Sequence, residues 1–184
     1  MKKQLEGLKV AILCDTGFEQ SEMTEPRKAL DQAGAKTVLI SPVHEKIRGW
    51  SDDQWKDEFS VDLDLNNANP DDYDALHLPG GVINPDKLRG SELAIAFIKA
   101  FVDAKKPIAA ICHGPWTLIN AQGVKGKTVT SWPSIKIDLI NAGATWVDKP
   151  VVKDGFLVTS RQPEDIPVYN TAMIEMFGQA VKKK

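Results

Sequence analysis

The chain has 184 residues, of which 42% are hydrophobic and 26% charged, and its formal net charge is −2. This length fits one domain of ordinary size, so we expect a single domain over residues 1–184. The near-zero charge excludes the strong positive field of a typical nucleic-acid-binding protein and gives no attraction to an anionic membrane. Two cysteines, Cys14 and Cys112, exclude a disulfide scaffold and indicate a reducing, cytoplasmic compartment. No apolar run approaches the ~20 residues that a membrane-spanning helix needs.

Short apolar runs, typical of buried strands, alternate along the chain with longer segments of helical periodicity. The expected strands are 8–14, 36–41, 74–78, 107–111, 127–131, 145–147 and 156–159. The expected helices are 21–33, 92–104, 114–121, 135–142 and 165–181. This alternation predicts an α/β fold in which helices cover both faces of a mostly parallel sheet.

Residues 42–69 interrupt that alternation. They carry Trp50, Trp55 and Phe59 among many acidic residues, which is typical of an irregular insert or a hairpin. Such a segment either closes over a site or joins subunits, or it is a surface loop with a few packed aromatic side chains. The sequence leaves these interpretations open.

Three segments follow the expected central strands at their carboxyl ends. Ligands of open α/β sheets bind outside these ends, so the rule selects residues 15–22, 79–86 and 112–116. The functional site is expected where these segments meet.

Cys112 directly follows an apolar strand, in the segment AAICHGP at residues 109–115. A nucleophile on a sharp strand-to-helix turn needs small residues two positions before and after it, and Ala110 and Gly114 supply them. Pro115 suits the first turn of a helix. Because the thiol then lies near a helix N-terminus, we expect a lowered pKa and a reactive thiolate. Cys14 lies inside an apolar strand and is more typical of a buried structural cysteine.

The chain resembles the ThiJ/PfpI superfamily, which includes the parkinsonism-associated protein, bacterial general stress proteins and intracellular protease I. The resemblance rests on ICHGP after one apolar strand, LPGG after the preceding strand and FEQSE after the first. It runs from about Leu8 to Met176, and SWPSIKIDLINAGATWVD and SRQPED are similar to the PfpI branch. It implies a flavodoxin-like, doubly wound, three-layer sandwich related to class I glutamine amidotransferases. It also implies a homo-oligomer, a dimer or a larger ring.

The resemblance implies His113 as the catalytic partner of Cys112, oriented by an acid from a neighbouring subunit. Asp86 lies at, or within one residue of, the position where PfpI-like proteins carry a glutamate. Its alternative role is to start a helical turn after Pro85. The resemblance also implies a glutamate that hydrogen-bonds the cysteine sulfur. Spacing favours Glu22 for this contact, and its alternative role is that of an acid at a helix N-terminus.

Glu19 is expected to line the same pocket as Glu22, or else to serve only as an acid at a helix N-terminus. A carboxyl group beside a thiolate must share a proton with it, so burial and the neighbouring charge should raise its pKa. The resemblance further implies an oxyanion hole formed by the backbone amides of Gly81 and His113. Gly80 would let the backbone approach a substrate closely. Trp132 either lines the pocket or is a core aromatic residue.

Other sequence features narrow the chemistry. His77 alternates with leucines inside a strand and is expected to be packed, whereas His44 is expected to be solvated. No histidine follows His113, so the late His-x-Glu of a class I glutaminase triad is missing. Neither GxGxxG nor GxxxxGK[ST] occurs, and no Cys/His cluster has metal-ligand spacing, so we expect no cofactor and no metal.

We therefore expect a cysteine-dependent stress-protection enzyme that acts on reactive carbonyls by glyoxalase III or deglycase-type chemistry. Its partners would be small reactive aldehydes, glycated amines or thiols, and peptides. A PfpI-type cysteine peptidase is the second interpretation, because proteolysis requires an extended groove that the sequence does not reveal. A third is a redox or stress sensor without turnover, based on an oxidisable cysteine.

Overall fold

The computed structural model describes residues 3–181, so the ends of the single domain expected over residues 1–184 lie outside the described part. Within it, a seven-stranded sheet has the order β11-β12-β8-β7-β1-β3-β6. The strands are β1 (Lys9–Leu13), β3 (Lys36–Ser41), β6 (Leu63–Asp64), β7 (Ala75–Leu78), β8 (Ile108–Ile111), β11 (Val151–Asp154) and β12 (Leu157–Ser160). All neighbours pair in parallel except β11 with β12. The chain runs outward from β1 in both directions, so the strand order reverses between β1 and β7.

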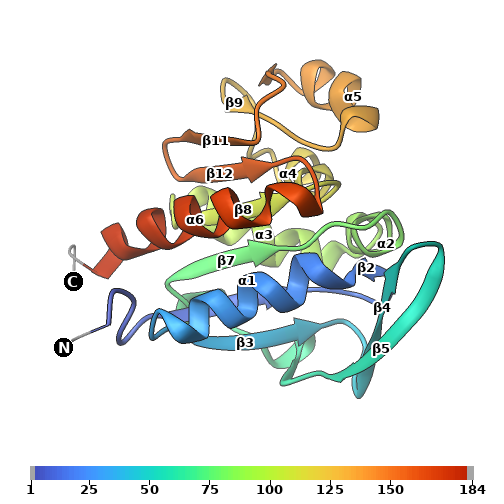
Figure 1. Cartoon of the computed structure of the whole chain (residues 1–184), viewed down its shortest axis with the longest axis vertical. Coiled ribbons are helices and arrows are strands. Elements are labelled where there is room, and N and C mark those ends of the chain that lie inside the picture. The colour runs from blue at the N-terminus through green and yellow to red at the C-terminus, as the bar shows by residue number, and fades with distance from the viewer. Residues whose placement is uncertain (1–2, 182–184) are drawn as a thin grey trace.

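Helices cover both faces of this sheet, as Figure 1 shows. Helices α1 (Gln20–Gln32) and α6 (Ile166–Val181) lie together on one face. The other face carries α3 (Glu92–Asp103) and α4 (Pro115–Asn120), with α2 (Ile83–Arg89) against them. The expected α/β class and three-layer sandwich are therefore confirmed.

The apolar spacing of the helices explains this layering. In α3, Ala94, Phe97, Ile98 and Phe101 are buried at the i, i+3, i+4 and i+7 positions of one stripe. The Ser91 side chain caps the same helix by accepting the Ala94 N–H. In α6, the fully buried side chains recur every four residues, at Tyr169, Met173 and Phe177. Successive strand residues point to opposite faces and so supply an apolar core to each layer.

The interrupting segment is a β-hairpin, β4 (Lys46–Ser51) and β5 (Gln54–Ser60). Its two-residue turn, Asp52-Asp53, has positive φ at both positions, as a type I′ hairpin turn requires. The short strand β2 (Phe18–Glu19), which the sequence did not predict, pairs with β4 through Phe18–Gly49 and Glu19–Trp50. This pairing places the hairpin beside the segment that follows β1.

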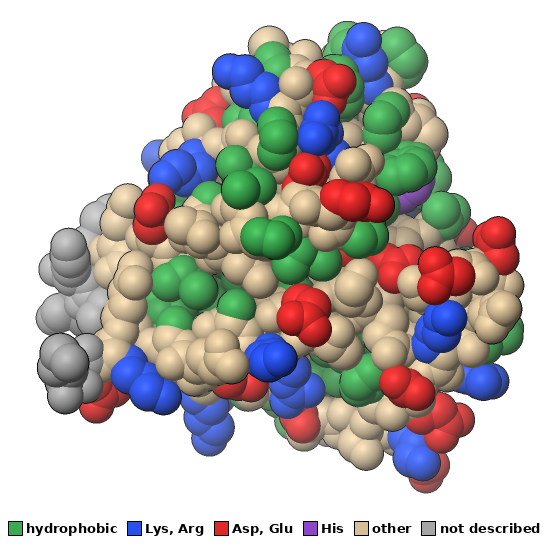
Figure 2. Space-filling view, in the orientation of Figure 1, with side chains coloured by type: hydrophobic (Ala, Val, Ile, Leu, Met, Phe, Trp, Pro, Cys, Tyr) green, Lys and Arg blue, Asp and Glu red, His purple; other side chains and the backbone are tan. Residues whose placement is uncertain are grey.

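The strands β9 (Thr128–Val129) and β10 (Thr145–Trp146) form a separate two-stranded sheet, and β9 lies beside β11 of the central sheet. The remaining helices are α5 (Lys136–Asn141) and four 3₁₀ helices, η1 (Leu65–Asn67), η2 (Pro70–Asp72), η3 (Pro133–Ile135) and η4 (Pro163–Asp165). Over residues 3–181, no helix has the length and apolar content to cross a membrane. On the face in Figure 2, Lys and Arg are scattered among acidic and polar side chains rather than gathered in one region.

Candidate active site

Cys112 lies on a sharp turn between β8 and α4, as the small flanking residues predicted. Its φ is 61°, in the left-handed region that a non-glycine residue rarely adopts. A side chain at Gly114 would place its Cβ 2.5 Å from the Leu78 carbonyl oxygen and 2.8 Å from that of Ile111. The turn therefore forms only with glycine there, and it aims the Cys112 thiol at the carboxyl edge of the sheet.

Glu22, in the first turn of α1, is fully buried and faces the Cys112 thiol. Its Oε2 accepts the Gly80 N–H at 2.9 Å, whereas its buried Oε1 accepts no hydrogen bond from any described residue. Burial and, to a smaller extent, the Glu19 carboxylate raise the pKa of Glu22 to about 8. A carboxyl group in this setting holds its proton at pH 7, so the unpartnered Oε1 is the natural place for that proton.

The pKa of Cys112 differs from the sequence-based expectation. Burial, followed by the charge of Glu22, raises the pKa of this thiol above its ordinary value, whereas the N–H groups of Gly81 and His113 lower it. The helix N-terminus was expected to lower the thiol pKa, but burial has the larger effect. Helix α4 has only six residues, and Cys112 is only 7% exposed. Cys112 and Glu22 thus form a buried pair that shares protons. When Glu22 is protonated, its charge no longer opposes a thiolate.

Gly80 and Gly81 bring the backbone against both reacting side chains. A Cβ at Gly80 would lie 2.6 Å from the Cβ of Cys112 and would overlap Oε2 of Glu22. Gly81 has a φ of 75°, and a Cβ there would lie 2.6 Å from the Glu19 nitrogen. These contacts explain why the LPGG motif has two glycines: the backbone lies close enough for its N–H groups to face Glu22 and Cys112.

The His113 imidazole lies between Cys112 and a residue that the sequence did not single out. Its Nδ1 is 3.3 Å from the Cys112 Sγ, and its Nε2 is 3.2 Å from the Ser134 Oγ in η3. The rings of Trp132 and Trp116 pack against the imidazole, with centroids 6.1 Å and 5.6 Å away. Burial lowers the pKa of His113 to about 4, so the ring is neutral at pH 7.

Asp86 does not reach this cluster within one chain. It is exposed in the first turn of α2, where its N–H donates to the Val82 carbonyl. This geometry matches the alternative role in a helical turn, in a helix that begins at Ile83, and within the described chain Ser134 is the residue that contacts Nε2 of His113. Action of Asp86 across a subunit interface stays a prediction.

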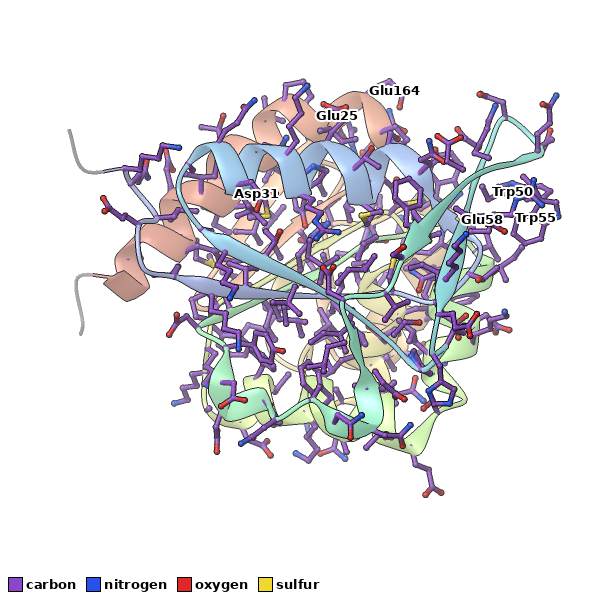
Figure 3. All side chains as sticks on the ribbon, turned by 90° about the horizontal axis from the view of Figure 1, so that it is seen from below. Glu25, Asp31, Trp50, Trp55, Glu58 and Glu164 are labelled. Carbon is purple, nitrogen blue, oxygen red and sulfur yellow. The ribbon has the colours of Figure 1, made fainter. Side chains whose placement is uncertain are left out.

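A pocket of about 360 Å³ opens above the thiol. It joins six predicted residues to others that the sequence analysis missed, above all Trp50 on β4 and Glu164 in η4. Figure 3 shows Trp50 beside Trp55 on the hairpin, and Glu164 near the start of α6. Trp132 lies at the pocket wall and is 37% exposed, so it is not a core residue. The lining consists of Gly17, Glu19, Glu22, Trp50, Gly81, Val82, Ile83, Cys112, His113, Trp132, Pro163 and Glu164.

The other two histidines are outside the pocket lining, as expected. His77 is buried in β7, with Nδ1 2.9 Å from the Tyr169 hydroxyl and Nε2 2.8 Å from the Glu22 carbonyl oxygen. It therefore fixes the backbone that carries Glu22. His44 is exposed and pairs with Asp64. Among residues 3–181, no three His, Cys, Asp or Glu side chains come together as metal ligands.

Comparison with known proteins identifies the family. The pattern of the DJ-1/PfpI family matches residues 8–176. The chain belongs to the DJ-1/PfpI family. The family resemblance seen in the sequence is therefore confirmed, and the matched range includes the whole Cys112 cluster.

Relatives of this DJ-1/PfpI chain carry several names. It is 45% identical over 172 residues to General stress protein 18 of Bacillus subtilis, covering 93% of this chain and 98% of the relative. It is 40% identical over 173 residues to Protein/nucleic acid deglycase 2 of Escherichia coli, covering 92% and 98%. It is also 40% identical over 170 residues to "Putative cysteine protease YraA" of Bacillus subtilis, with the same coverage. The solved Drosophila melanogaster DJ-1beta matches with a TM-score of 0.82 at 28% identity, covering 100% of this chain and 97% of that one.

Proposed function

We propose that this chain is a cysteine-dependent enzyme that converts reactive carbonyl compounds, either free 2-oxoaldehydes or their early adducts with amines and thiols. The observation that carries the proposal is the cluster of Cys112, Glu22 and His113 beneath one small pocket. A nucleophile, a buried carboxyl group that keeps its proton near neutral pH and a neutral imidazole are the groups that addition to a carbonyl and proton transfer require.

The reaction on a 2-oxoaldehyde needs no external oxidant. The Cys112 thiolate adds to the aldehyde carbon, the carbonyl electron pair moves to oxygen, and that oxygen takes a proton to give a hemithioacetal. Glu22 or His113 then removes the C1 proton, and a proton is delivered to C2 through an enediol, which gives a 2-hydroxy thioester. Water adds to the thioester and the carbon–sulfur bond breaks, releasing the 2-hydroxy acid and the thiol. C1 is oxidised and C2 is reduced, so the electrons balance within the substrate.

The N–H groups of Gly81 and His113 are proposed to bind the oxyanion of this addition. Both contact the Cys112 sulfur in the free protein, so an oxygen bonded to the adjacent carbon would form close to them. Gly80 completes this backbone segment without entering the pocket lining. Glu19, Trp50 and Trp132 would form the walls that hold the substrate chain.

The size of the pocket favours small substrates over peptides. About 360 Å³ accommodates a molecule of a few carbon atoms, or the end of one modified side chain, whereas a peptidase needs an extended groove. The deglycase relative supports the carbonyl chemistry, and the relative named as a protease keeps peptide hydrolysis as the second candidate. Activity on reactive carbonyls in a reducing, cytoplasmic compartment suits two free cysteines.

The deciding experiment measures lactate formed from methylglyoxal by the wild-type protein and by Cys112→Ala, with a casein digest in parallel. We expect lactate from the wild type, background rates from Cys112→Ala and no casein cleavage. Cys14→Ala is the matched control, because Cys14 is buried outside the pocket lining and should retain the wild-type rate. Equal lactate rates in wild type and Cys112→Ala would remove the proposal, and Cys112-dependent casein cleavage would favour the peptidase.

Redox sensing by Cys112 is a distinct candidate. A carboxyl group held next to the sulfur, as Glu22 is here, can donate a hydrogen bond to an oxidised sulfur. Intact mass after mild peroxide treatment tests this role, with Glu22→Gln and Glu22→Ala as the compared variants. An oxygen adduct on Cys112 that the Gln variant keeps and the Ala variant loses would support sensing. Absence of any adduct would exclude it.

A further inference from the structure

We propose that Ser134 is a positioning residue that fixes which nitrogen of His113 carries the proton. Its hydroxyl group donates to Nε2, so the neutral ring carries its hydrogen on Nδ1 and donates to the Cys112 sulfur. His113 would then stabilise the thiolate without accepting its proton. The contacts on the two sides of the ring carry this inference.

The argument begins at the sulfur. The Cys112–Glu22 pair shares a proton along its own contact, and Oε1 of Glu22 is buried without any other donor. A sulfur that shares its proton with Glu22 has none to give to Nδ1, which lies 3.3 Å away. A bare Nδ1 lone pair facing a thiolate would be repulsive, whereas an N–H at the same position is attractive. Nδ1 is therefore the protonated nitrogen.

The second step concerns the opposite side of the ring. With one hydrogen on a neutral imidazole, Nε2 is an acceptor and needs a donor. The Ser134 hydroxyl, 3.2 Å away, can donate, whereas a carboxylate at that place could only accept and would draw the hydrogen to Nε2. A serine there thus favours hydrogen on Nδ1, from which His113 stabilises the thiolate. An acid would favour hydrogen on Nε2 and leave Nδ1 free to take the proton from sulfur. Burial of the ring is consistent with its neutral state.

His77 supplies an internal contrast. Its Nε2 faces the Glu22 backbone carbonyl, which only accepts, so Nε2 carries the hydrogen and Nδ1 accepts from the Tyr169 hydroxyl. The two buried histidines should therefore be opposite tautomers in the same protein. This contrast is measurable whether or not the protein turns over any substrate.

The catalytic consequence rests on the proposed function: if His113 is a donor, Glu22 is the group that moves the proton between C1 and C2. Removing the Ser134 hydroxyl should then lower kcat about five- to tenfold, the worth of roughly one hydrogen bond, with KM unchanged. Ser134→Thr keeps the hydroxyl and should restore the rate.

The test is ¹⁵N NMR of imidazole nitrogens at pH 7 in histidine-labelled wild type, Ser134→Ala, Ser134→Thr and Ser134→Asp. We expect the Nδ1–H form at His113 in the wild type and Ser134→Thr, a mixture in Ser134→Ala and the Nε2–H form in Ser134→Asp. The His77 signals should stay in the Nε2–H form throughout, which controls for folding. An Nε2–H form at His113 in the wild type, or identical His113 spectra in the wild type and Ser134→Ala, would overturn the proposal. An absence of turnover with the expected spectra would count against the proposed function alone.

Discussion

The two cysteines of this chain lie at equivalent places in the sheet and have different surroundings. Cys14 follows β1 and Cys112 follows β8, and both strands end at the same edge. Burial raises the pKa of both thiols, and the charge of Glu22 raises both further. Cys14 hydrogen-bonds through its backbone to Ile40 and packs in an apolar cluster. The backbone of Cys112 instead has a left-handed conformation, and its side chain lines a pocket.

A cysteine at the end of a central strand is therefore not enough to form an active site. Both thiols are buried and near the same carboxyl group, but only Cys112 has backbone N–H donors on its sulfur, from Gly81 and His113, together with a side-chain hydrogen bond to Glu22. Those donors depend on a turn that lets the backbone approach closely. Four experiments test this difference between the two thiols and the residues around Cys112.

Alkylation should distinguish the two thiols most strongly. Iodoacetamide at pH 8 is expected to add once to the native protein, at Cys112, and a second time only after denaturation, because Cys14 is fully buried outside the pocket lining. Intact mass and peptide mapping measure this difference. Labelling of Cys14 at the rate of Cys112, or no labelling of Cys112 in the native protein, would contradict this contrast and remove the proposed chemistry.

Gly80→Ala should disrupt the Cys112 side of the comparison without touching Cys14. The new methyl group would overlap Glu22 and Cys112, so we expect activity to fall about a hundredfold and stability by about 1–3 kcal/mol. Gly90→Ala is the matched control, because its Cβ would lie 3.4 Å from the nearest atom and its φ is −79°. Urea unfolding and steady-state rates compare the two variants, and equal effects would contradict the role assigned to Gly80.

Glu22→Gln should change how stability depends on pH. Burial raises the Glu22 pKa from 4.5 to about 8, so between these values the unfolded chain releases a proton that the folded chain keeps. Stability of the wild type should therefore fall as pH rises through this range, by at most about 5 kcal/mol. Glutamine cannot ionise, so the variant should gain stability over the wild type as pH rises from 5 to 8. Parallel pH profiles in urea unfolding would show that Glu22 does not titrate this way.

Asp86→Asn should give the smallest effect. The side chain is exposed and does not line the pocket, so we expect a stability change within about 0.5 kcal/mol and an unchanged rate per chain. Light scattering and activity should be followed together on dilution. A loss of rate that tracks dissociation, and that the variant shows without dilution, would instead support action of Asp86 across a subunit interface.

The features that sequence predicted well are local ones. The α-helices other than α2, the main strands and the Cys112 turn follow from apolar spacing and from small residues within a few positions of each other. Glu22 was found because a family motif marks it. The edge strands β2, β6 and β11 escaped prediction because two to four residues of pairing leave little periodicity to detect.

The missed site residues share a different cause. Trp50 lines the pocket and Ser134 contacts His113, although both lie far from Cys112 in sequence and neither belongs to a motif for nucleophilic catalysis. The thiol pKa was mispredicted for a related reason. The helix N-terminus is a local feature, whereas burial and the Glu22 carboxyl come from other elements. Contacts that depend on the packed sheet are beyond local pattern analysis.

The left-handed backbone at Cys112 implies that the turn which presents the thiol costs folding stability. A side chain at a φ of 61° crowds its own backbone, and glycine is free of this penalty. A Cys112→Gly protein should therefore melt at a higher temperature than Cys112→Ala, although neither has a nucleophile. Selection of variants for thermal stability alone would therefore favour glycine at this position and the loss of the nucleophile.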